Sequence, residues 1–287
     1  MPNPPEIATP TFLRRLISNR SGAVGLVLVT VYLIVGLLGW IGLTPYPALE
    51  QHARDRLQGP SATYLMGTDL FGRDIASRIM GGAANSLRVA LLSVSLATAF
   101  GTLLGTLSGY FGGLFDIIVM RVMDVFFALP ALLLALVVVS VLGPGMNNTV
   151  LAIGTVYTPI FARVARGPVL AVKQMEYVQA ARCIGAGNAR ILYQHVLPNT
   201  LAPLIVQVSL ALSWSLLTEA GLSFLGLGTQ PPLPSWGVML SESRGIAEMA
   251  PWLMLFPALA IMLGVLGFNL LGDGLRDVLD PRLRGLR

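Results

Sequence analysis

The sequence predicts an all-α integral membrane protein with six transmembrane helices. Of the 287 residues, 54% are hydrophobic and only 11% are charged, whereas soluble domains carry about 25% charged residues. Mean hydropathy is +0.73. Several apolar runs reach the roughly 20 residues that a helix needs to cross a bilayer core of about 30 Å. Lipid must therefore cover much of this chain, which excludes a soluble enzyme and, with one cysteine, a secreted disulfide scaffold.

Each expected span is an apolar run bounded by charges or turn formers. The run of turn formers at 143–148 separates the third span from a shorter fourth span, and Glu219 is the one acid inside the fifth. The first span is too long for a cleaved signal peptide and is expected to be retained. The expected spans cover residues 22–43, 89–115, about 116–142, about 149–163, 201–227 and 249–272.

The positive charges set the expected orientation. Thirteen of the nineteen Lys and Arg residues fall on the side that carries both termini. Short cytoplasmic loops are enriched in Lys and Arg, so both termini are predicted to be cytoplasmic in a multi-pass protein of the inner or plasma membrane. An even number of spans agrees with this orientation. We expect a cytoplasmic tail (1–21), a first helix with an extracytoplasmic loop (22–84), a five-helix core (85–272) with a cytoplasmic loop at 167–199, and a cytoplasmic tail (273–287).

The sequence gives no sign of covalent chemistry. The single lysine, Lys173, follows Val172, so no Gly-Lys-Ser/Thr phosphate loop exists and ATP is not expected to bind to this chain. His52 and His195 fall on opposite sides of the membrane, and no histidine–cysteine cluster with metal-ligand spacing is present. We therefore expect no enzyme, no metal site and no cofactor in this chain, and no nucleic acid as a partner.

The cytoplasmic loop 167–199 predicts two short helices joined by a turn. Apolar residues recur there at helical spacing until Gly185 and Gly187 interrupt the pattern. Asn188 is expected to cap the second helix, and Pro198 to end it just before the fifth span. The apolar face of such a pair needs lipid headgroups or another protein to cover it.

This loop resembles the cytoplasmic signature loop of ABC importer permeases. In that pattern Glu-Ala-Ala is followed by three residues, Gly, nine residues and Ile-x-Leu-Pro. Here Gln179 replaces the first Glu and His195 the Ile, and both changes resemble the peptide/nickel branch of the family. The resemblance implies that the turn docks in a cleft on an ATPase. The candidate coupling residues are Glu176, Ala180, Ala181, Arg182, Gly185, His195, Leu197 and Pro198.

Three further motifs, at 67–74, 219–237 and 269–282, resemble the second permease subunit of dipeptide, oligopeptide and nickel importers. The resemblance extends over nearly the whole chain and implies the ABC type I importer permease fold. It also implies a second related permease, two ATPases that bind ATP and Mg²⁺, and an extracytoplasmic substrate-binding protein, in addition to membrane lipid. The residues expected where that protein docks are Asp69, Arg73, Asp74 and Trp236.

Two questions stay open at this point. Glu219 is either a structural acid, bonded to loop backbone or paired with an arginine such as Arg88, or a functional group, as acids within spans often are. The substrate is expected to be a dipeptide or oligopeptide, with a nickel chelate or another small solute as the alternative. A stand-alone secondary transporter is the alternative from another class, but its usual charged groups at the membrane midplane are nearly absent here.

Overall fold

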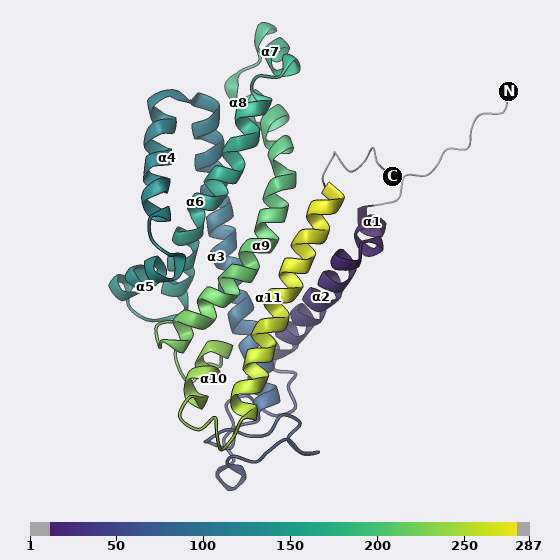
Figure 1. Ribbon diagram of the computed structural model, residues 1–287, viewed down its shortest axis with the longest axis vertical. Coiled ribbons are helices and arrows are strands. Elements are labelled where there is room, and N and C mark those ends of the chain that lie inside the picture. Colours follow the sequence, from purple (N-terminus) through teal and green to yellow (C-terminus); the bar gives the residue numbers. More distant parts are fainter. Residues whose placement is uncertain (1–11, 280–287) are drawn as a thin grey trace, which may run out of the picture.

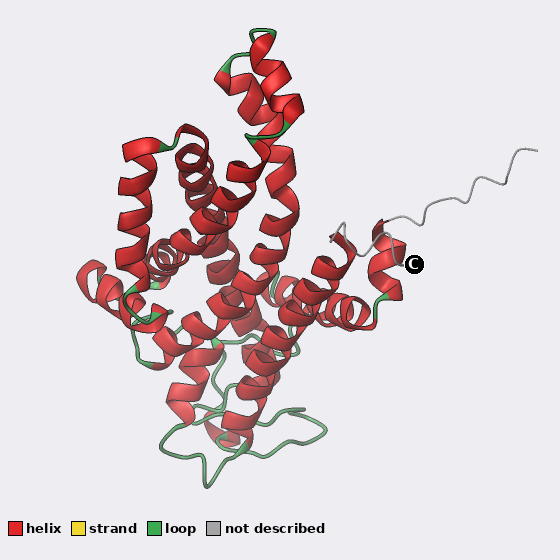
Figure 2. Cartoon of the chain, turned by 45° about the horizontal axis from the view of Figure 1, so that its top comes forward, coloured by secondary structure: helices red, strands yellow, loops and turns green. Residues whose placement is uncertain are grey.

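The computed structural model describes residues 12–279, and this part of the chain is mainly helical (Figures 1 and 2). Within it, an isolated bridge between Thr68 and Asp74 is the only β-pairing. A short 3₁₀ helix covers Ala53–Asp55, and a π-helical turn covers Leu192–Val196. The helices are α1 (Phe12–Ser18), α2 (Arg20–Trp40), α3 (Ile75–Phe111), α4 (Gly113–Phe127), α5 (Ala131–Leu142), α6 (Met146–Val172), α7 (Glu176–Cys183), α8 (Asn188–Ile191), α9 (Leu197–Phe224), α10 (Trp236–Ser243) and α11 (Trp252–Leu279).

The all-α membrane fold is confirmed by the length and composition of these helices. Four are long and apolar enough to cross a membrane singly: α2, α3, α11 and the continuous helix Asn188–Phe224 that contains α9. The pair α4 and α5 adds a fifth span if its 94° bend is counted within one crossing. Helix α6 has 27 residues but is not among the helices that meet this criterion, so the described residues give four or five spans where six were expected.

Several helices differ in extent from the expected spans. Helix α3 begins at Ile75 rather than near Val89, and α6 continues past Arg163 to Val172 instead of forming a short span. The third span is broken before Pro130, because the ring of a proline disfavours a helical conformation in the residue before it. Helix extends into both expected tails, since α2 begins at Arg20 and α11 runs to Leu279, and the division of the chain into tails and core stays a prediction. The rest of both tails, including the end of the motif at 269–282, lies outside the described residues.

The long helices form an elongated bundle with two unlike ends (Figure 1). One end carries α7 and α8 at its tip, and α1 and the C-terminal end of α11 lie toward the same side. The opposite end carries α10 and the long loop 41–74. Figure 2 draws the loops at this end in green. The two regions that the sequence marks as functional are therefore separated by the length of the bundle.

One large apolar core joins α2, α3, α6, α9, α10 and α11. Tyr32 lies at its centre, with its ring 4.9 Å from that of Trp236 and 6.4 Å from that of Phe268. Helices α3 and α6 pack backbone against backbone, because a Cβ at Gly105 would lie only 2.1 Å from the carbonyl oxygen of Ala162. Small residues at this position let the two helix backbones approach closely.

Candidate functional site

Helix α7 ends in a Schellman turn centred on Gly185. The amide of Ala186 donates to the carbonyl of Ala181 (2.9 Å), and the amide of Gly185 donates to that of Arg182 (3.0 Å). Gly185 has φ of +86°, a left-handed conformation that costs a residue with a Cβ about 1–2 kcal/mol. No neighbouring atom lies within 4 Å of where that Cβ would be. Backbone conformation, and not crowding, is therefore what requires glycine here.

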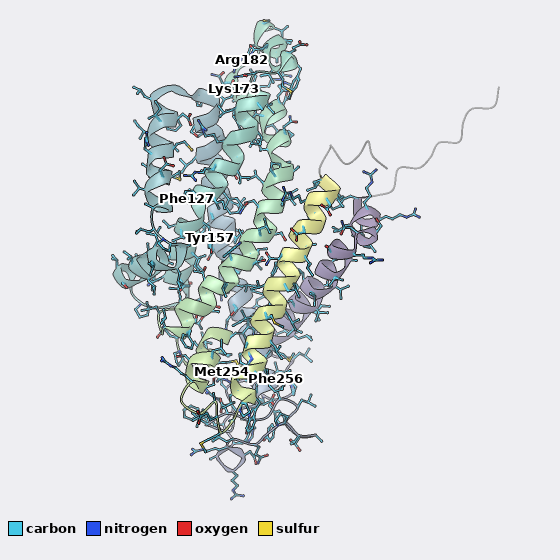
Figure 3. The ribbon with its side chains drawn as sticks, in the orientation of Figure 1. Phe127, Tyr157, Lys173, Arg182, Met254 and Phe256 are labelled. Carbon is cyan, nitrogen blue, oxygen red and sulfur yellow. The ribbon has the colours of Figure 1, made fainter. Side chains whose placement is uncertain are left out.

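The turn projects from the molecule. Figure 1 shows α7 and α8 beyond the ends of the other helices, and Arg182 lies in this tip in Figure 3. Ile184, at the apex, is 86% exposed. Glu176, Ala180 and Arg182 are exposed on α7. The turn is thus small, preformed and exposed, with one apolar side chain at its apex and charged residues nearby on α7.

The opposite face of this hairpin is buried on the bundle. Ala181 is buried, and an apolar cluster fixes the two short helices against α3 and α6; its members are Tyr110, Val169, Val172, Val178, Ile191 and Val196. Asn188 was expected to cap α8, and this is wrong: the capping position is Gly187. The Asn188 side chain instead accepts a hydrogen bond from the Tyr110 hydroxyl (2.8 Å).

Pro198 does not end the second helix as expected. Because a proline has no amide hydrogen, it cannot donate to the carbonyl of Gln194. The amide of Leu197 reaches back to Leu192 instead, and the chain widens into a π-helical turn. Leu197 and Pro198 then begin α9, so that Asn188–Phe224 is one continuous helix. The segment 167–199, which we call the signature segment, is joined directly to a membrane span.

His195 lies in that π-helical turn and has a packing role. Its ring meets the ring of Tyr177 edge-on, with 5.8 Å between the centroids. Its carbonyl accepts from the side-chain amide of Asn199 (2.6 Å). His195 therefore connects α7 to the start of α9.

At the opposite end, Asp69 and Arg73 belong to a buried ionic cluster. Asp69 accepts from the amides of Phe71 (2.8 Å) and Arg73 (2.9 Å) and pairs with the Arg73 side chain. The carboxylate of Glu242, on α10, accepts hydrogen bonds from the side chains of Arg73 (3.1 Å) and Arg78 (2.7 Å). The Arg78 side chain is only 1% exposed. Because a buried arginine requires carboxylate partners, the cluster fixes the loop onto α3 and α10.

Asp74 and Trp236 are also buried at this end. Asp74 caps α3 by accepting from the amide (2.8 Å) and the hydroxyl (2.6 Å) of Ser77. Trp236 is 1% exposed, and its indole N–H donates to the carbonyl of Ile79 (3.1 Å). The residues expected at the docking site of a binding protein thus lie beneath the surface. Docking at this end stays a prediction, and its direct contacts would come from the surface that these residues support.

Glu219 is fully buried in α9. Its carboxylate accepts from the hydroxyls of Ser86 (2.8 Å) and Ser223 (2.7 Å), so it joins α9 to α3. The Ser223 hydroxyl in turn accepts from the amide of Thr229 (3.1 Å). Two serines therefore occupy the place in which we expected loop backbone or Arg88, and a structural role fits this geometry.

The sequence pattern of a known protein family matches residues 101–285 of the chain. That family is described as the "Binding-protein-dependent transport system inner membrane component". The chain belongs to this family. It is 45% identical over 271 residues to the dipeptide transport system permease protein DppC of Alkalihalophilus pseudofirmus, covering 94% of this chain and 89% of the relative.

Glutathione permeases are comparably similar. The chain is 45% identical over 275 residues to the glutathione transport system permease protein GsiD of Pectobacterium atrosepticum (95% and 89% covered). Against the GsiD of Escherichia coli it is 44% identical over 286 residues (98% and 94% covered). The resemblance drawn from the motifs is therefore confirmed: this is an ABC importer permease of the dipeptide/oligopeptide type, a multi-pass transport subunit.

Motif reading in this permease missed residues that act through long-range contacts. Arg78 and Glu242 complete the ionic cluster, and Lys173 donates to the carbonyl of Gly109 (2.7 Å). The guanidinium of Arg166 donates two hydrogen bonds (2.7 and 2.6 Å) to the carboxylate of Asp116. This pair holds α4 against α6. Isolated charges within helices were the one signal available, because an arginine or acid at such a position needs a partner.

Proposed function

We propose that this permease is one of two permease subunits in an ATP-driven importer of short peptides. Its relatives at 44–45% identity are named as dipeptide and glutathione permeases. Both of those ligands are small peptides, which supports the same substrate class here. A nickel chelate or another small solute is the alternative substrate.

The projecting turn at residues 184–187 is the observation that carries the coupling role. It is exposed and preformed by the Schellman hydrogen bonds, and it is continuous with the span Asn188–Phe224. In the proposed mechanism, each permease of the pair offers such a turn to one of two ATPases, which bind ATP and Mg²⁺. Closure of the ATPases displaces the turn, and α9 moves with it.

The proposed orientation places the signature segment in the cytoplasm. Most of the Lys and Arg residues lie on that side in the sequence, as the positive-inside rule requires. The described ends of the chain, α1 and the end of α11, also lie toward the tip that carries α7 (Figure 1). The loop 41–74 and α10 then face the extracytoplasmic side.

We place half of the translocation pathway in an apolar cavity of about 720 Å³ between α3 and the helix Asn188–Phe224. Thr102 and Leu103 line it from α3, and Leu197 and Leu201 from the facing helix. A second permease would supply the other wall. This location fits the coupling role, because the signature segment adjoins both helices of the cavity.

The extracytoplasmic end is the proposed platform for the substrate-binding protein. Its buried ionic cluster keeps the loop 41–74 in one shape. Apolar side chains are exposed at this end, among them Leu65 in that loop (68%) and Met249 between α10 and α11 (76%). In this proposal Asp69, Arg73, Asp74 and Trp236 act by holding that surface in place.

Co-purification followed by reconstitution tests the proposal. A mild-detergent preparation from the native membrane should contain a second permease-like chain and ATPases with Walker motifs, identified by mass spectrometry. The complex in liposomes, with the binding protein added, should take up labelled dipeptides only when ATP is present. Recovery of the chain alone, with uptake that needs no ATP, would overturn the proposal.

A further inference from the structure

Two membrane spans meet the signature segment at one residue, Asn188. Asn188 is the first residue of α8 and hence of the continuous helix Asn188–Phe224. Its side chain is also bonded to α3, since its Oδ1 accepts from the hydroxyl of Tyr110 at 2.8 Å. One side chain thus joins the start of one long helix to the end of another.

Tyr110 is placed to receive motion from the segment. Only 6% of it is exposed, and its ring belongs to the apolar cluster beneath α7 and α8. The Arg182 guanidinium lies 5.4 Å from the ring centroid. Arg182 lies two residues before the projecting turn and Asn188 directly follows it, so Tyr110 contacts the chain on both sides of that turn.

A second bond fixes the neighbouring residue of α3. The ammonium group of Lys173, at the start of the segment, donates to the carbonyl of Gly109 at 2.7 Å. Figure 3 shows Lys173 and Arg182 together at the tip. The end of α3 is therefore held from the beginning of the segment and from the residue that follows its turn.

We propose that Tyr110 and Asn188 form a positioning link that makes α3 move with α9 when the turn is displaced. This inference rests on the proposed coupling function. Apolar contacts are non-directional, whereas a hydrogen bond weakens steeply when its length or angle changes. The hydrogen bond therefore fixes the relative position of the two helices more strictly than apolar packing alone. With the link intact, both walls of the cavity between α3 and Asn188–Phe224 respond to one displacement.

The number of ATP molecules hydrolysed per peptide imported measures this link directly. Tyr110→Phe keeps the ring in its cluster and removes only the hydroxyl, and Asn188→Leu removes the acceptor at similar size. Asn188→Asp keeps an acceptor oxygen and serves as the conservative rescue. Gln174→Leu is the matched control, because Gln174 lies in the same segment, is exposed and does not line the cavity.

For Tyr110→Phe and Asn188→Leu, we expect the assembled complex to hydrolyse about three- to tenfold more ATP per peptide imported, since ordinary hydrogen bonds contribute on this scale. Asn188→Asp and Gln174→Leu should stay within about twofold of the original ratio. An unchanged ratio in both disruptive variants would overturn the link, and so would an Asn188→Asp variant as impaired as Asn188→Leu. The proposed function fails separately, if the unmodified complex imports peptide without ATP.

Discussion

The two ends of this permease, both marked by sequence motifs, are built in opposite ways. The signature turn at 184–187 is exposed, and a Cβ at Gly185 or Gly187 would meet nothing within 4 Å. At the other end, the motif residues Asp69, Arg73, Asp74 and Trp236 are between 1% and 6% exposed. The motif residues at one end therefore form an exposed surface, whereas those at the other end are buried and support the surface above them.

This contrast separates two kinds of variant. Changes in the signature turn alter a surface and one backbone conformation, so they should impair transport while the protein still folds. Changes in the buried cluster leave charges without partners, so they should impair folding first. The predictions below test that separation, beginning with the largest effect.

Arg78→Met should give the largest loss of stability. It leaves Asp69 and Glu242 with one buried cationic partner fewer, which costs about 3 kcal/mol, the lower part of the range for broken buried pairs because Glu242 is 32% exposed. Thermal unfolding in detergent and the yield of folded protein measure it. Arg121→Met, at a side chain that is 82% exposed, is the control and should change neither. Unfolding of Arg78→Met at the original temperature would contradict the scaffold assignment.

Glu219 sharpens the comparison because it is buried and bonded within the bundle. Glu219→Leu leaves the hydroxyls of Ser86 and Ser223 without their acceptor and should destabilise the protein by about 1–3 kcal/mol. Glu219→Gln keeps an oxygen acceptor and should cost less than about 1 kcal/mol. Unfolding and the uptake rate per folded complex are the measurements. A stable Glu219→Gln variant that no longer transports would show that the charge itself is functional.

The smallest expected effect concerns Tyr64 in the loop 41–74. Its hydroxyl donates to Asp55 (3.0 Å), and burial together with this hydrogen bond raises the pKa of Tyr64 to about 12. Because the pKa is raised above that of the unfolded chain, the stabilisation is fully present below about pH 10 and is lost as pH rises through the folded value. Tyr64→Phe should therefore lower the unfolding temperature slightly and equally at pH 6 and pH 9. A difference that appears only at the lower pH would contradict this account.

The membrane fold and the signature turn could be predicted from the sequence because both depend on local signals. Uncharged apolar runs define spans whatever their neighbours are, and Gly185 lies where a left-handed residue must end α7. The extension of α6 past Arg163 was missed. Hydropathy alone cannot place an arginine whose charge is matched by a distant acid, as Arg163 is by Asp124 (2.6 Å).

The roles of the site residues were less accessible. Whether Asp69 and Trp236 face a partner or the interior depends on α10, which is far away in the sequence and packs on α3. Asn188 was predicted to cap a helix, but its side chain accepts a hydrogen bond from Tyr110 on α3 instead. No local sequence pattern reveals such a long-range partner. Pro198 was assigned to a helix end because the π-helical turn that lets the helix continue has no simple sequence signature.

The central claim, that the turn at Gly185 transmits the action of an ATPase, is tested most directly by a matched pair of valine variants in the reconstituted transporter. Gly185→Val forces a β-branched residue into φ of +86°, whereas Gly187 has φ of −70° and ψ of 156°, which valine accepts. ATP-driven peptide uptake should fall at least about tenfold for Gly185→Val, consistent with a strain of 1–2 kcal/mol or more, and Gly187→Val should retain at least about half of the original rate. Equal uptake by the two variants, at normal membrane insertion, would contradict the account.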